Sequence, residues 1–128
     1  MDLIHEDRGS AVAEFTLVGM LLVALALAVV QLALSLHVRN TLLDAAAEGA
    51  RYASLAGSSP AGGVERTREL IDAAISSAYA EDISAARVSL AGVDAVEVTV
   101  RATLPVIGLS GVANGLEVEG HAPIETLE

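Results

Sequence analysis

The chain has 128 residues, a formal net charge of −10, no cysteine and a hydrophobic content of 53%. This length suits one modest domain, and the composition indicates a link to a membrane. Without cysteine the chain can form neither a disulfide nor a zinc–thiolate site. Its seven basic residues are scattered arginines, so no basic stripe exists for nucleic acid, and we expect no nucleic-acid partner.

The first element in chain order is a long apolar run, FTLVGMLLVALALAVVQLALSL, at Phe15–Leu36. It holds 22 residues without a charge. As a helix it would span roughly 33 Å, close to the bilayer's hydrocarbon core of about 30 Å. The sequence therefore predicts a transmembrane helix over residues 10–38, in contact with a lipid bilayer.

The helix is expected to continue into water through Asn40–Gly57, which is rich in alanine and has no break before its last residue. Small residues recur every four positions there and form a stripe along one helix face, which allows another backbone to approach closely. This stripe predicts helix packing, either against a partner helix or against the chain's own domain. Its members are Ala45, Gly49, Ala53 and Gly57.

Beyond this helix the period of the apolar residues changes. SSPAGG at Ser58–Gly63 predicts a loop, and Val64–Ala80 has the spacing of a second, amphipathic helix. Alternating residues then predict three strands joined by a tight turn at Ala91–Asp94 and a loop at Ile107–Gly115. The expected strands are Arg87–Leu90, Ala95–Leu104 and Leu116–Ile124.

The expected fold class is thus an α+β membrane protein. A transmembrane helix extends into a long helix, a second helix follows, and a small antiparallel sheet of three strands closes the domain over residues 39–128. Three strands with a helix are about the minimum for independent stability.

Chemistry-bearing motifs are absent from the sequence. The histidines at positions 5, 37 and 121 share no metal-ligand spacing, and no nucleophile motif or phosphate-binding loop occurs. We therefore expect no catalytic activity, cofactor, bound metal or small-molecule substrate.

GSAVAEF, at Gly9–Phe15, resembles the processing site of type IV prepilins. Together with the alanine-rich helix and a short β-rich tail, it is similar to the TadE-like pseudopilins of tight-adherence (Flp) pilus systems. The likeness is specific from Arg8 to about Gly57. It implies a minor pseudopilin with a leader at residues 1–9, in the cytoplasmic membrane, with its C-terminal domain outside the cytoplasm and possible incorporation into a surface pilus.

The resemblance also implies residue roles. A prepilin peptidase would cut between Gly9 and Ser10, and Glu14 with Phe15 would take part in assembly. In pilins the partner of this glutamate is held to be a free amino terminus, here that of Ser10. Other pilin-like subunits and a pilus assembly platform are the further implied partners, with roles in assembly, adhesion or secretion.

Several alternatives stay open. The chain could be an uncleaved single-pass membrane protein that serves as an interaction component of an envelope complex. It could be a secreted domain, although the leader holds three acids and one arginine and the apolar run exceeds a signal core. RGSAVAEF could also be an ordinary helix start capped by Ser10. The orientation of the helix in the membrane also stays open. Arg39 and Arg51 outnumber Arg8, and by charge alone this would put the C-terminal side in the cytoplasm, opposite to what the resemblance implies.

Overall fold

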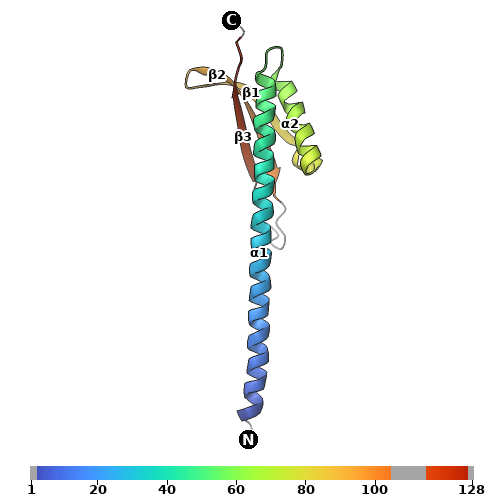
Figure 1. The fold of residues 1–128 in the computed structure, drawn as a ribbon, viewed down its shortest axis with the longest axis vertical. Coiled ribbons are helices and arrows are strands. Elements are labelled where there is room, and N and C mark those ends of the chain that lie inside the picture. Colours follow the sequence, from blue (N-terminus) through green and yellow to red (C-terminus); the bar gives the residue numbers. More distant parts are fainter. Residues whose placement is uncertain (1–2, 105–114, 127–128) are drawn as a thin grey trace. The chain divides into compact units, whose positions relative to one another are not determined.

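The computed structural model describes residues 3–104 and 115–126 (Figure 1). The chain divides into two compact units, residues 1–34 and 35–128. The first unit consists of the N-terminal part of helix α1, Leu3–Ser54, and the second begins within the same helix. The long helix, the second helix and the three-stranded sheet confirm the fold class expected from the sequence.

In the second unit, α1 is followed by α2, Pro60–Ala74, and a short 3-10 helix, Ser77–Tyr79. Strands β1, Asp82–Leu90, and β2, Val93–Thr103, then form a hairpin. Strand β3, Gly115–Pro123, pairs with the other edge of β2. The result is an antiparallel meander in the order β1-β2-β3.

Helix α2 begins earlier than the sequence predicted. The expected loop at Ser58–Gly63 is wrong over its last four residues, since Pro60 already opens the helix. The Ser59 side chain accepts a hydrogen bond from the Gly62 backbone N–H at 3.2 Å, and proline is well suited to a first helical position. The helix also ends at Ala74, short of the predicted end at Ala80, and the chain tightens into the 3-10 turn.

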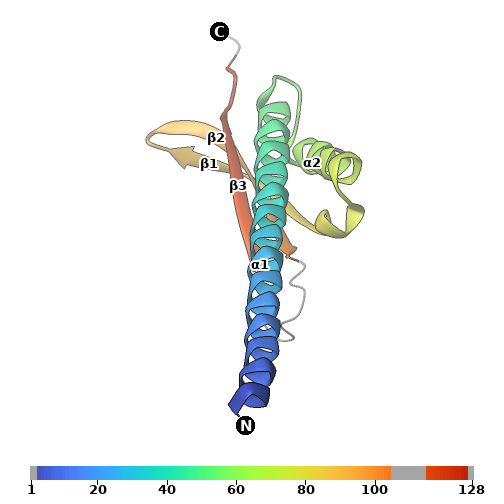
Figure 2. The ribbon, with the colours of Figure 1, turned by 60° about the horizontal axis from the view of Figure 1, so that its bottom comes forward.

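The strands are longer at their starts than predicted. β1 begins at Asp82 instead of Arg87. In this additional part of the strand, the side chains of Ile83 and Ala85 pack against the core. The hairpin turn has two residues, Ala91 and Gly92, both with positive φ, as in a type I′ turn. Figure 2 shows the turn end of this hairpin pointing away from α1 and α2. The predicted loop at 107–115 lies outside the described residues, except that Gly115 starts β3.

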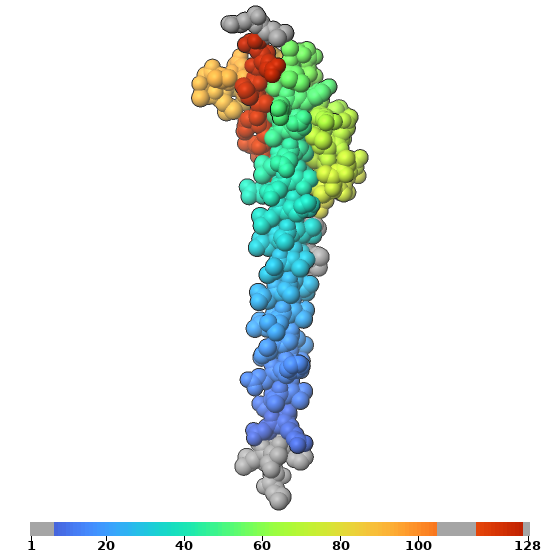
Figure 3. Space-filling view, viewed as in Figure 1, coloured from blue at the N-terminus to red at the C-terminus, as the bar shows by residue number. Residues whose placement is uncertain are grey.

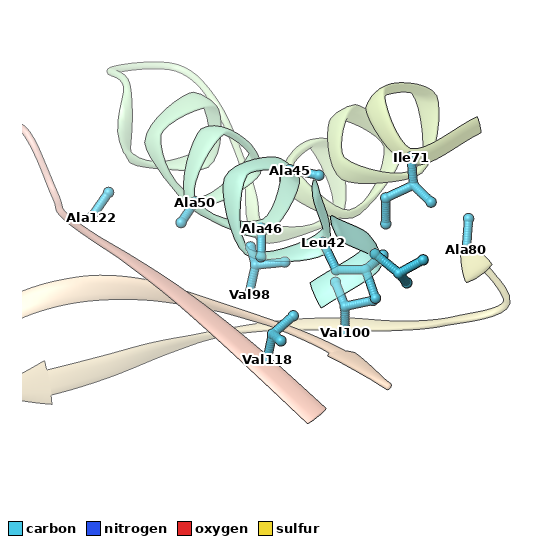
Figure 4. Close-up of a cluster of buried hydrophobic side chains, with 11 residues drawn as sticks. Leu42, Ala45, Ala46, Ala50, Ile71, Ala80, Val98, Val100, Val118 and Ala122 are labelled. Atoms are coloured by element: carbon cyan, nitrogen blue, oxygen red, sulfur yellow. The ribbon is translucent and has the colours of Figure 1, made fainter. Parts of the chain in front are cut away.

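The core of the second unit lies on the C-terminal part of α1. Leu42, Ala46 and Ala50 are fully buried on one face of α1. Figure 4 shows Leu42 and Ala46 directed at valines of the sheet, namely Val98, Val100 and Val118. In the space-filling view α2 and β3 lie on opposite sides of this part of α1 (Figure 3). Small residues dominate this helix because it is enclosed on two sides.

Candidate processing and assembly site

The segment Gly9–Phe15, expected to carry the function, lies within α1. The helix begins at Leu3, so Ser10 does not cap its N-terminus, contrary to the alternative of an ordinary helix start. Gly9, Ser10 and Glu14 are all exposed. A Cβ added at Gly9 would meet no atom of the described residues within 4 Å, so no contact in this part of the chain requires glycine at this position.

The apolar residues that follow are exposed as well. Phe15 is 80% exposed, and most large apolar side chains from Val12 to Leu36 are more than half exposed. By length and composition, α1 contains a candidate membrane span within Asp7–Ser54. Exposed surface of this extent in a folded chain requires lipid or other helices around it, so a single-pass membrane protein is the consistent interpretation.

Thr16 lies next to this segment, and its hydroxyl bonds within the helix, donating to the Val12 carbonyl at 2.8 Å. Such a bond lets a polar side chain enter an apolar environment with its donor satisfied. Glu14 differs, because a carboxylate cannot donate, and only an external donor or cation would offset its cost in lipid.

The predicted small-residue stripe faces α2 over three of its four members. A Cβ on Gly49 would overlap the Thr67 hydroxyl and lie 2.8 Å from the Gly63 carbonyl oxygen. A Cβ on Gly63 would lie 2.7 Å from the Ala53 side chain. The buried Thr67 hydroxyl donates to the Gly63 carbonyl at 2.8 Å and lies 3.4 Å from that of Ala45. These positions are thus occupied by the chain's own second helix.

Gly57, the fourth member, has a different role. It lies beyond the end of α1 with φ of 83°, a conformation that glycine adopts without the steric cost of a Cβ. The Ser58 N–H bonds to the Leu55 carbonyl at 3.1 Å, which closes the turn between the helices. Gly57 therefore serves the connection between α1 and α2 rather than a helix face.

One group of side chains that sequence spacing did not reveal gathers on the outer face of the sheet. Glu97 of β2 stands directly opposite His121 of β3, and Glu119 is two residues before that histidine on the same face. The donor atoms of all three lie within 4.8 Å of one another. Only the strand register brings these residues together, which linear spacing could not show.

Residues 9–51 match the family model described as TadE-like protein. This confirms, over that segment, the resemblance drawn from the sequence. No curated protein and no solved structure gives a significant match.

Proposed function

From the TadE-like segment at residues 9–51, we propose that this chain is a minor pseudopilin of a tight-adherence pilus. In this proposal a prepilin peptidase cuts between Gly9 and Ser10, and the processed helix then packs beside other pilin-like helices. The C-terminal domain lies outside the cytoplasm and acts at the assembly platform in pilus assembly, adhesion or secretion. The observation that carries the proposal is that the family match begins at Gly9.

The exposed apolar surface of α1 supports an assembly role. From Val12 to Leu36 the helix offers apolar side chains on all sides, with Gly19 as a small interruption whose Cβ would meet nothing within 4 Å. In lipid, a small residue lets a neighbouring helix approach closely. The membrane segment can therefore pack against several helices of other subunits at once.

Cleavage would also supply a partner for Glu14. Removing residues 1–9 takes three acids and one arginine from totals of seventeen and seven, which leaves fourteen and six and a formal net charge of −8. In this proposal the new ammonium group of Ser10, four positions before Glu14 in the sequence, pairs with the Glu14 carboxylate of the same or of a neighbouring subunit. An ion pair is far less costly in a low-dielectric setting than a lone carboxylate.

At the proposed cleavage site, the helix must open locally before a peptidase can cut the chain. The helix runs through Gly9 and Ser10, and a peptidase needs an accessible, locally opened bond. Glycine lowers the cost of opening this turn, since it is less favourable than alanine in a helix by about 1 kcal/mol. For an uncleaved membrane protein, the alternative function, no contact with the described residues of the chain requires glycine here.

The experiment compares two glycine variants of α1 made in cells that hold the cognate peptidase. Gly9→Leu should leave the chain at its precursor length, because bulk before the scissile bond is excluded. Gly19→Leu is the matched control, since both glycines are helical and open to added side chains. The control should be processed like the natural chain. Equal processing of both variants would contradict the proposal and favour the uncleaved alternative.

A further inference from the structure

We propose that Glu97, Glu119 and His121 form a zinc-binding site on the outer face of the sheet. The three side chains belong to two paired strands and project from the face opposite the helices. Their donor atoms, two carboxylate oxygens and one imidazole nitrogen, lie within 4.8 Å of one another. This site is independent of the pilin-like function.

The register of β2 and β3 fixes the arrangement. Glu97 and His121 are direct cross-strand partners, and Glu119 pairs with Thr99 on the same face. Directly opposite side chains on an antiparallel pair have Cβ atoms about 5 Å apart. Long side chains at such positions can converge on one ion with changes of rotamer only, so the backbone is already in place.

The donor set favours zinc over calcium or magnesium. Imidazole nitrogen and carboxylate oxygen are both zinc ligands, whereas calcium and magnesium take oxygen donors and leave the imidazole unused. The His121 Nε2 atom lies 2.7 Å from a Glu97 carboxylate oxygen. If both atoms bound a zinc ion, each at about 2.0–2.2 Å, they would move apart to the separation of two ligands on a tetrahedral centre. Water would take the fourth position.

Charge around the group also favours a cation. Among the described residues, the Glu119 carboxylate has no hydrogen bond or ion pair. The nearby Arg101 donates instead to Glu117 at 2.8 Å. This hydrogen bond and the charge of Glu117 raise the pKa of Arg101, and Glu119 adds a smaller contribution at longer range. The Glu97–Glu119 pair thus keeps an excess of negative charge that a divalent cation would offset.

Zinc bound in this way would hold β2 and β3 in register. Because the site exists only when the strands are paired, binding would stabilise the folded domain by an amount that grows with the logarithm of the zinc concentration above the dissociation constant. Without an ion, Glu97 and His121 would form only a cross-strand hydrogen bond with Glu119 nearby. Such a pair contributes little to the stability of the sheet.

The test titrates Zn²⁺ into the full chain in detergent by calorimetry near neutral pH, and follows the Tm by circular dichroism. We expect one Zn²⁺ per chain, a rise in Tm, and no displacement by excess Ca²⁺. Glu119→Gln and His121→Asn should each weaken Zn²⁺ binding at least about tenfold. The loss of a group that only supports a metal ligand already costs about that much, and these residues are proposed as ligands. Both variants change exposed residues and should keep the metal-free Tm.

Matched controls separate this site from general attraction to an acidic chain. His5→Asn with His37→Asn removes the other two histidines, and Glu81→Gln removes an exposed acid near β1. These variants should bind Zn²⁺ like the natural chain. The proposal is overturned by absence of saturable binding, by displacement with Ca²⁺, or by equal losses in the site and control variants.

Discussion

The backbone of Gly120 in β3 packs directly against the backbone of Ala46 in α1. A Cβ on Gly120 would overlap the carbonyl carbon of Ala46 and the nitrogen of Ala47, and would lie 2.6 Å from the Ala46 carbonyl oxygen. The three nearest atoms of the described residues all belong to the backbone, which cannot move aside as the end of a side chain can. This contact sets how closely the sheet approaches the helix.

Gly120→Ala should therefore destabilise the domain strongly. Because backbone atoms of α1 would have to shift, we expect the free energy of unfolding to fall by about 3 kcal/mol. Denaturant unfolding of the full chain in detergent measures it. Gly115→Ala is the control on the same strand, where an added Cβ has no neighbour within 4 Å among the described residues, and it should change little. Similar effects of both variants would contradict the close approach.

Gly49 makes the corresponding contact with α2. Gly49→Ala would place a methyl group on the buried Thr67 hydroxyl, and we expect a loss of about 2 kcal/mol in the free energy of unfolding. Gly19→Ala, in an open part of the same helix, should leave domain unfolding unchanged.

The same Gly49 variant distinguishes the two interpretations of the small-residue stripe. If the stripe packs within the chain, Gly49→Ala should lower the Tm, and the fraction that still folds should cross-link to partner subunits as before. An intermolecular interface predicts an unchanged Tm and lost cross-linking.

Ala91 adopts a left-handed conformation, with φ of 51°, at the first position of the hairpin turn. Asparagine tolerates this conformation far better, and Asn-Gly is a favoured type I′ pair. Ala91→Asn should raise the free energy of unfolding by about 1 kcal/mol. Ala86→Asn, in the exposed middle of β1, should not stabilise and serves as the control. A Tm unchanged by Ala91→Asn would contradict the assigned turn.

Glu14→Gln tests the proposed charge partner. Cleavage should proceed as in the natural chain, because Gly9 and Ser10 are intact. Recovery of the chain with other pilin-like subunits should fall at least about tenfold, since an amide cannot pair with an ammonium group as a carboxylate does. Glu48→Gln, which alters an exposed acid further along the same helix, should leave this recovery unchanged. Equal recovery of all three chains would contradict a role for Glu14 in assembly.

Much of the fold followed from periodicity. The charge-free run predicted the membrane helix, and the alternation of Val96, Val98 and Val100 predicted the central strand with its buried face. Element boundaries were harder to predict, because local capping decided them. Ser59 and Pro60 start α2 inside a stretch whose glycines suggested a loop, and those glycines are needed for contact with α1.

The two candidate sites also differ in how far the sequence could predict them. The segment Gly9–Phe15 is contiguous, so its likeness to a processing site could be read directly, and the family match confirms the TadE-like character of this region. The group of Glu97, Glu119 and His121 depends on strand pairing, which brings together Glu97 and His121 although they are 24 positions apart in the sequence. Spacing in the sequence held no sign of it, and the absence of a metal site was expected instead.

The most direct test of the account is the intact mass of the natural chain, extracted from membranes of cells that hold the cognate prepilin peptidase. We expect a mature chain that begins at Ser10 and lacks the nine preceding residues. A chain that still begins at residue 1 would contradict processing at Gly9 and favour the uncleaved membrane protein.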